Sequence, residues 1–358
     1  MTAPVIGFIG AGNMATSLIG GMLQKNVKPA NLIASDSKPE QCAALERQFQ
    51  IRTSTDNAVL AAECDVLLLA VKPQVMQDVC RALPRERAFS SSSRRIRASS
   101  SRASSSRWVC TRADSAQPTP LVLMVHGGPW ARDGWGFNAM AQWMANRGYA
   151  VLQVNYRGSS GYSKTFSRKG DKQWGIGDMQ HDLTDAVRWA IEKKIADPER
   201  VCIYGGSYGG YACLAGMAFT PGLYKCGVDI VGPSNIKTLL DSIPPYWGPL
   251  RNDMLRKIGD VDADEDFNKA ISPLFHVDKI SAPLLISQGA NDPRVKQAEA
   301  DQIAFAMADK GIPVEYVLYP DEGHGWARPE NRIDFNGRAE LFLAEHLGGH
   351  AEPFSKPS

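Results

Sequence analysis

The stretch VCIYGGSYGGYACLAGMAF, residues 201–219, constrains the fold more than any other part of the chain. An apolar run ends in glycines and a second apolar run follows, which predicts a strand, a sharp turn and a helix. Gly205, Ser207 and Gly209 form a GxSxG pattern at the turn. Flanking side chains larger than hydrogen would collide with the strand or helix, and the tight turn pushes the Ser207 hydroxyl out over the sheet. Ser207 is therefore a candidate nucleophile.

A serine hydroxyl needs a general base, and the base needs an acid that orients it. Asp292 in SQGANDPRV and His324 in YPDEGHGW each follow a predicted strand, in the order serine, acid, histidine. Asp321 and Asp301 are competing acids, but Asp321 lies too close to His324 in sequence and Asp301 falls within a predicted helix. We predict a triad of Ser207, Asp292 and His324.

The other five histidines fit a catalytic base less well. His324 alone is flanked by glycines on a loop after a strand. His181 lies in a predicted helix and precedes Ser207, which reverses the required order. The remaining ones are expected to be surface or internally bonded side chains: His126, His276, His346 and His350.

Two backbone amides are expected to form the oxyanion hole that stabilises the tetrahedral intermediate. One belongs to Tyr208, the residue after the nucleophile. The other comes from HGGP, residues 126–129, where Gly127 and Gly128 let the backbone approach the oxygen; we favour Gly128. His126 is expected to bond the backbone of its own loop rather than to take part in catalysis.

Strands alternate with helices across residues 119–349. TPLVLMV, YAVLQVN, VCIYGG, APLLISQG and VEYVLYP read as strands, with helical patterns between them. Such alternation predicts a doubly wound, mostly parallel sheet. This segment is long enough for one complete α/β-hydrolase domain.

Residues 1–84 predict a different unit, a partial Rossmann-like dinucleotide-binding fragment. Gly10, Gly12 and Ala15 give GxGxxA directly after the strand PVIGFIG and at a helix start. Amides and the helix dipole at such a turn can bind a pyrophosphate, and Asp36 ends the second strand near the position of a ribose-binding acid. We expect a weak, vestigial NAD(P) site and no required cofactor.

Serine and arginine dominate residues 85–118, where neither the helical nor the alternating apolar period continues. This composition predicts a disordered linker. RNA binding or phosphorylation is an alternative for such a tract, but no aromatic residues are interleaved in it, and we interpret it as a spacer. Residues 350–358 are expected to form a tail.

Composition excludes several classes of partner. The formal net charge of +2 in 358 residues does not predict binding to nucleic acid or to an anionic membrane. No run of about eighteen apolar residues and no signal-peptide pattern occurs. The seven cysteines include no CxxC pair, which favours reduced thiols and no metal site. We expect a cytoplasmic protein that acts on small-molecule esters or short peptides.

HGGPW, NYRGSSGY, GGSYGGY, GANDPRV and DEGHGWARPENR resemble the catalytic domain of the prolyl oligopeptidase family, in its acylaminoacyl-peptidase and dipeptidyl-peptidase-like branch. The resemblance runs from about residue 118 to 349 and implies the same triad and oxyanion hole. It also implies that Arg294 holds a substrate carbonyl, and that Val295, Tyr246 and Trp247 line an apolar acyl pocket. For Tyr246 and Trp247, core packing is an equal alternative.

Relatives in that family carry a β-propeller that covers the active site, and residues 1–118 show no propeller-like pattern of repeats. We therefore expect a more open site and a serine hydrolase that cleaves carboxylic esters, with weak peptidase activity. The alternative is an acylaminoacyl- or dipeptidyl-type serine peptidase.

GFIGAGNMA and CDVLLLAVKPQVM resemble the N-terminal part of pyrroline-5-carboxylate reductase. A remote alternative is therefore that NAD(P)-dependent reductase, although nothing after residue 84 resembles its substrate half. A third possibility is that residues 1–84 form an interaction module, whose sheet edge pairs with a second copy in a homo-oligomer.

Overall fold

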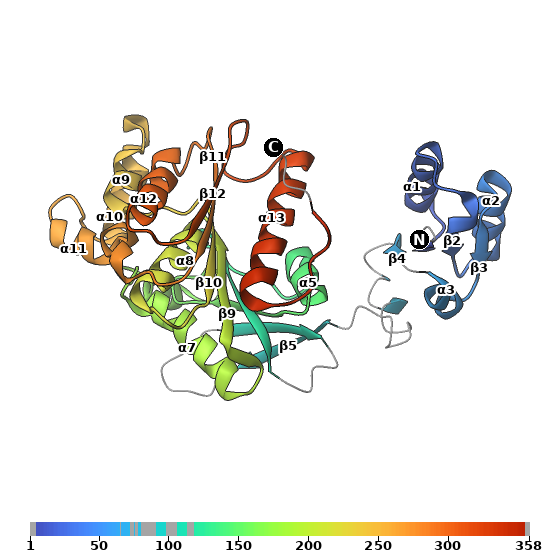
Figure 1. The fold of residues 1–358 in the computed structure, drawn as a ribbon, viewed down its shortest axis with the longest axis horizontal. Helices are drawn as coiled ribbons and strands as arrows, with labels where there is room; N and C mark the ends of the chain where they lie inside the picture. The colour runs from blue at the N-terminus through green and yellow to red at the C-terminus, as the bar shows by residue number, and fades with distance from the viewer. Residues whose placement is uncertain are drawn as a thin grey trace. The chain divides into compact units, whose positions relative to one another are not determined.

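The computed structural model describes residues 5–64, 66–71, 75, 78, 79, 91–97, 106–112 and 118–354. The chain forms two compact units, residues 1–90 and 91–358 (Figure 1). Both units are α/β structures, as the alternation of strand and helix patterns predicts.

The N-terminal unit is built on a four-stranded parallel sheet of order β3-β2-β1-β4. Side chains on β1 alternate between its two faces: Phe8 packs in one apolar cluster and Ile9 in the other. Helices α1 and α2 cover the first cluster and α3 the second, which confirms the Rossmann-like prediction. Its elements are β1 (Ile6–Ile9), α1 (Asn13–Gln24), η1 (Pro29–Asn31), β2 (Leu32–Ser35), α2 (Pro39–Phe49), β3 (Arg52–Ser54), α3 (Asn57–Glu63) and β4 (Val66–Leu69).

An eight-stranded sheet of order β12-β11-β10-β9-β7-β8-β6-β5 forms the centre of the C-terminal unit. Its strands pair in parallel from β12 to β8, and β6 and β5 are antiparallel to their neighbours. The strands are β5 (Ser91–Arg97), β6 (Ser106–Arg112), β7 (Thr119–Val125), β8 (Ala150–Asn155), β9 (Ala196–Gly206), β10 (Cys226–Ile230), β11 (Leu284–Gly289) and β12 (Val314–Tyr319).

Helices cover both faces of this sheet. Residues of α5 and α13 pack in the apolar cluster on one face, and residues of α7, α8 and α12 pack in the cluster on the other. The helices are α5 (Ala139–Asn146), α6 (Lys164–Arg168), α7 (Asp178–Glu192), α8 (Tyr208–Phe219), α9 (Ile236–Asp241), η2 (Pro245–Trp247), α10 (Gly248–Ile258), α11 (Glu265–Ile271), η3 (Pro273–Lys279), α12 (Gln297–Asp309) and α13 (Pro329–Leu347). Within the described part of the chain, none of the helices is long and apolar enough to cross a membrane.

The prediction of a disordered linker over residues 85–118 is wrong for two segments. β6 pairs antiparallel with β8, and β5 pairs antiparallel with β6. The sequence pattern misses these strands because their pairing uses backbone groups: the edge of β8 offers unpaired N–H and C=O groups that a neighbouring segment of almost any composition can bond. The remaining residues of the predicted linker lie outside those described, apart from Pro118.

The start of the predicted tail is attached to the hydrolase unit. The backbone N–H of His350 donates to the Arg147 carbonyl, at 3.0 Å, and that of Glu352 donates to Glu340 Oε1, at 2.6 Å. Glu340 is also paired with the Arg147 guanidinium, at 2.9 Å. These contacts hold residues 350–352 against α5 and α13.

Candidate active site

Ser207 occupies the turn between β9 and α8 in a strained backbone conformation, with φ 59° and ψ −119°. Its N–H donates to the carbonyl of Ile230 on the neighbouring strand, at 2.8 Å. A Cβ on Gly205 would collide with the backbone of Gly209, and one on Gly209 would collide with the Val125 carbonyl oxygen. The glycines therefore allow the close packing of strand and helix that holds the serine in this rare conformation.

Asp292 and His324 are brought together from two different loops. Asp292 Oδ2 lies 2.7 Å from His324 Nδ1, and its other oxygen accepts the N–H groups of Arg294 and Val295, at 2.8 and 3.0 Å. Because a carboxylate is an acceptor, this contact makes Nδ1 the protonated nitrogen and leaves the Nε2 lone pair free to act as a base.

The order of the strands brings the three predicted triad residues to one edge. Ser207 follows β9, Asp292 follows β11 and His324 follows β12. These strands are parallel members of the same sheet, so their carboxyl ends share an edge, where open α/β sheets bind ligands. The catalytic roles of the three residues stay a prediction.

The competing acids have other partners. Asp321 is paired with the Arg328 guanidinium at 3.0 Å, and Asp301 accepts a hydrogen bond from the Tyr316 hydroxyl at 2.7 Å. His181 is on α7, exposed, and lies 3.6 Å from Asp178. Asp292 is the acid that contacts His324.

The HGGP loop lies against the serine turn. A Cβ on Gly127 would come within 2.9 Å of the Gly206 carbonyl oxygen and 3.4 Å of Ser207 Cβ. Gly128 has φ +120°, a conformation that favours glycine, and Tyr208 is the first residue of α8. Both predicted oxyanion residues therefore lie in segments next to Ser207, and their role as amide donors stays a prediction.

His126 makes the contacts expected of a structural histidine. Its Nδ1 donates to the carbonyl of Gly127 at 2.9 Å, and its Nε2 lies 2.9 Å from the Ser159 hydroxyl. Burial lowers the pKa of His126 to about 4, although the bond to Gly127 acts in the opposite direction. The side chain is therefore neutral at physiological pH and holds its own loop.

Glu322 is a buried carboxylate in the His324 loop that the sequence analysis missed. It accepts the N–H groups of Ala327 and Arg328, at 2.9 and 2.8 Å, and the side-chain amide of Asn331, at 2.9 Å. Burial opposes its ionisation, but these donors outweigh burial and lower the pKa of Glu322. In the sequence, Glu322 could have been singled out because it lies two residues before His324, in DEGH.

The predicted pocket residues have different environments. Arg294 is exposed, and the Tyr246 side chain is 77% exposed, which excludes core packing for that tyrosine. Val295 is buried in the main core, so core packing already accounts for its apolar side chain. The Trp247 side chain lies outside the described residues. Substrate contact by these four residues stays a prediction.

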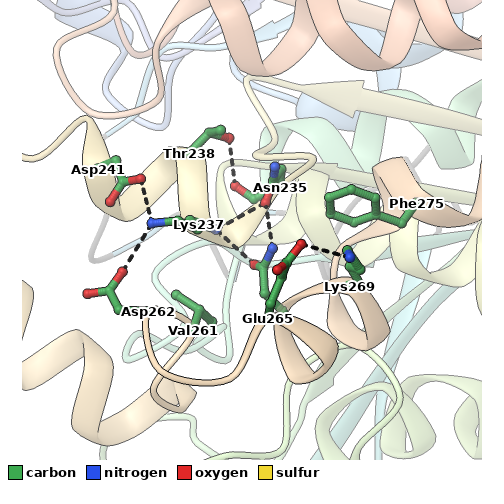
Figure 2. A pocket seen from close by; sticks show the side chains of 10 residues that line it. Asn235, Lys237, Thr238, Asp241, Val261, Asp262, Glu265, Lys269 and Phe275 are labelled. Atoms are coloured by element: carbon green, nitrogen blue, oxygen red, sulfur yellow. Dashed lines mark hydrogen bonds and ion pairs between the residues drawn. The ribbon is translucent and has the colours of Figure 1, made fainter.

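A cavity of about 290 Å³ lies at α9 and α11, and no predicted catalytic residue lines it (Figure 2). Its cations are already paired: Lys237 with Asp241 and Asp262, and Lys269 with Glu265. In the described part of the chain, no group of three or more histidine, cysteine or acidic side chains could hold a metal ion.

The GxGxxA turn of the N-terminal unit joins β1 to α1 through a glycine at positive φ. Gly10 has φ +101°, and a Cβ on it would meet the Ala70 carbonyl oxygen. Space around Gly12 is open, and Ala15 is buried where α1 packs on the sheet. Asp36 accepts the N–H of Ala11 at 2.8 Å and lies beside the turn. These residues fit a pyrophosphate and ribose site.

Comparison with known proteins agrees with this division into two units. The model of the prolyl oligopeptidase family matches residues 135–350, and a model described as "NADP oxidoreductase coenzyme F420-dependent" matches residues 5–92. A Mycobacterium tuberculosis puromycin-hydrolyzing peptidase superposes with a TM-score of 0.70 at 27% identity, covering 75% of this chain and 41% of its own. An acylaminoacyl peptidase of Pyrococcus horikoshii superposes with a TM-score of 0.66 at 26% identity. The match covers 74% of this chain and 43% of that peptidase.

Two curated relatives are more similar in sequence. Dipeptidyl aminopeptidase BIII of Pseudoxanthomonas mexicana is 57% identical over 241 residues, which cover 67% of this chain and 35% of the relative. Dipeptidyl peptidase family member 6 of Caenorhabditis elegans is 49% identical over 242 residues, which cover 67% and 33%. The chain thus spans about a third of the length of these relatives. It belongs to the prolyl oligopeptidase family.

Proposed function

We propose that the chain is a serine peptidase that acts through an acyl-enzyme formed on Ser207. The observation that carries the proposal is the contact of 2.7 Å between His324 Nδ1 and Asp292 Oδ2, at the same sheet edge as the strained Ser207 turn. A serine on such a turn, with a base oriented by a buried carboxylate, is the arrangement that acyl transfer requires.

In the proposed reaction, His324 Nε2 takes the proton of Ser207 Oγ as that oxygen attacks the scissile carbonyl carbon. The amides of Gly128 and Tyr208 donate to the oxyanion of the tetrahedral intermediate. The protonated imidazole then gives its proton to the leaving amine nitrogen, and the C–N bond breaks. Water then attacks the acyl carbon while His324 Nε2 takes its proton, and the imidazolium returns that proton to Ser207 Oγ as the ester bond breaks. Asp292 stabilises the imidazolium in both halves of the reaction.

Peptides are the proposed substrates, rather than the esters expected from the sequence. The relatives and solved structures similar to this chain are named as dipeptidyl peptidases, acylaminoacyl peptidases and a puromycin-hydrolyzing peptidase. The comparisons therefore favour the peptidase alternative and give the carboxylesterase interpretation no specific support. The two relatives at 57% and 49% identity are both named as dipeptidyl peptidases, so we propose release of dipeptides from amino termini.

The proposal is tested on the full chain with three substrates: a dipeptidyl arylamide, an N-acyl-aminoacyl arylamide and an aryl ester. The two arylamides release the same aryl amine, and the ester releases the corresponding aryl alcohol. We expect Ser207-dependent cleavage of the dipeptidyl arylamide, with kcat/KM above that of the acylated arylamide. Cleavage of the ester alone would reject the peptidase assignment and return the carboxylesterase interpretation.

For the N-terminal unit we propose weak dinucleotide binding without a catalytic role. The GxGxxA turn and Asp36 fit the group, but a mononucleotide-binding half alone provides few of the contacts that a dinucleotide needs. Gly10→Val should remove any change in NAD(P)H fluorescence on binding, because a side chain at φ +101° would meet the Ala70 carbonyl and distort the turn. It should leave peptide hydrolysis unchanged. Turnover of pyrroline-5-carboxylate that depends on Gly10 would contradict this proposal.

A further inference from the structure

The two proposed oxyanion donors belong to different elements. Gly128 lies in the loop after β7, and Tyr208 begins α8. Both amides must lie about 3 Å from one oxygen atom, so a small change in the distance between these segments weakens the hole. Some contact must therefore fix the HGGP loop relative to the first turn of α8.

Tyr156, directly after β8, lies between these two segments. Its ring stacks on the His126 ring, with centroids 4.4 Å apart and planes at 14°. On its other side it contacts the Tyr208 ring, with centroids 5.3 Å apart and planes at 33°. Tyr156 is fully buried. The rings of His126, Tyr156 and Tyr208 therefore form a continuous row. This row connects the HGGP loop, two residues before Gly128, with the start of α8.

The Tyr156 hydroxyl adds a directional contact. It donates to the backbone carbonyl of His126 at 2.8 Å. Burial raises the pKa of Tyr156 well above its ordinary value, so the hydroxyl keeps its proton. His126 in turn bonds the Gly127 carbonyl and the Ser159 hydroxyl. The start of the HGGP loop is therefore held by several hydrogen bonds at once.

We infer that Tyr156 is a positioning residue, which sets the separation between the Gly128 and Tyr208 amides by holding the HGGP loop through His126. The inference rests on the proposed function, because it requires those two amides to stabilise an oxyanion. Tyr156 acts on the substrate only indirectly, through the backbone of the HGGP loop.

Tyr156→Phe tests the inference in the full chain, because it removes the hydroxyl and keeps the stacked ring. We expect kcat to fall about tenfold with KM nearly unchanged, since the oxyanion forms only after substrate has bound. Affinity for a peptidyl trifluoromethyl ketone, which forms a tetrahedral adduct on the serine, should fall by the same factor.

Tyr211→Phe is the matched control. The Tyr211 hydroxyl is also buried and also donates to a backbone carbonyl, that of Ile271, at 2.6 Å. Its ring belongs to the same aromatic cluster, 5.6 Å from that of Tyr208. Among the described residues it bonds Ile271 and packs on Trp174 and Tyr208, away from the HGGP loop. Its removal should therefore lower stability about as much as Tyr156→Phe and leave kcat within about twofold.

Equal kcat for Tyr156→Phe and the wild type, or equal losses in the two variants, would overturn the inference. Ser159→Ala is a milder change at the same loop, and it keeps the test decisive if Tyr156→Phe does not fold. It removes the hydroxyl that contacts His126 Nε2, so kcat should fall about threefold at constant KM. An unchanged kcat would count against the inference. Failure of a fluorophosphonate to label the wild-type protein would instead reject the proposed function itself. This outcome is distinguishable from a failure of the inference, in which the wild type is labelled and the variants keep the wild-type kcat.

Discussion

The carboxylate of Asp292 accepts three hydrogen bonds, two from backbone amides on one oxygen and one from His324 on the other. The amides fix the carboxylate while its second oxygen orients the imidazole. The buried Asp292 side chain therefore both orients the His324 imidazole and places a negative charge beside it.

Asp292→Asn should lower kcat by about 10⁴-fold while the fold is retained, because a side-chain amide facing Nδ1 favours the wrong imidazole tautomer. KM should change much less. Steady-state kinetics with a dipeptidyl arylamide measure the effect, and circular dichroism checks the fold. A kcat within tenfold of the wild type would show that Asp292 does not orient the base.

Asp229 is the buried acid on β10, opposite Gly205 of the serine turn in strand register. Its Oδ1 accepts the N–H of Gly232 at 2.9 Å, and its Oδ2 has no partner among the described residues. Burial raises the pKa of Asp229 to about 7 from an ordinary 3.8, and the Gly232 bond only partly offsets this. The folded protein therefore holds a proton on Asp229 that the unfolded chain releases.

Stability linked to Asp229 is fully present below about pH 4 and is lost as pH rises toward 7, because the unfolded state binds fewer protons across this window. Asp229→Asn stays neutral. Relative to the wild type, its free energy of unfolding should therefore rise between pH 4 and pH 8, by about 4 kcal/mol at most. Urea unfolding at several pH values measures the difference between the two proteins, and a difference independent of pH would contradict the assignment.

At the scale of elements, the loop from β12 to α13 carries His324 and is held by Glu322. The Glu322 carboxylate accepts two backbone amides from the far side of the loop. Its own carbonyl accepts the N–H of Asn291, next to Asp292, at 2.9 Å. Glu322 therefore joins the loop of the base to the loop of the acid.

Glu322→Ala should lower kcat about tenfold or more, because the loop loses the acceptor that fixes its shape and His324 moves relative to Asp292. Glu330→Ala is the control: this nearby acid is exposed and contacts the Arg328 guanidinium at 3.8 Å, so activity should stay within about twofold. Equal kcat values for the two variants would show that the Glu322 network does not position the base.

Local sequence patterns predict those strands, turns and helices that depend mainly on residues close together in the chain. The strand, turn and helix around Ser207 follow from apolar runs and glycines, and the chain order of strands places Asp292 and His324 at one edge. Long-range contacts are not visible in such patterns. The pairing of β6 with β8, the Glu322 network and the stack of His126 on Tyr156 each join residues through the folded chain, and sequence analysis missed them.

At the scale of the whole molecule, the two units have separate sheets and separate apolar clusters. Ser207, Asp292 and His324 all belong to the second unit, together with both proposed oxyanion residues. The first unit matches an oxidoreductase model and carries none of these groups. The proposed hydrolysis therefore belongs to the C-terminal unit, in a chain that spans about a third of the length of its curated relatives.

Labelling with a fluorophosphonate, followed by peptide mass spectrometry, tests whether Ser207 is the nucleophile, because this reagent reacts with a serine whose neighbouring base has activated it. We predict one modified site, Ser207, with labelling lost in Ser207→Ala and strongly reduced in His324→Ala. An unlabelled wild-type protein, or a label on another residue that persists in Ser207→Ala, would show that Ser207 is not the activated nucleophile.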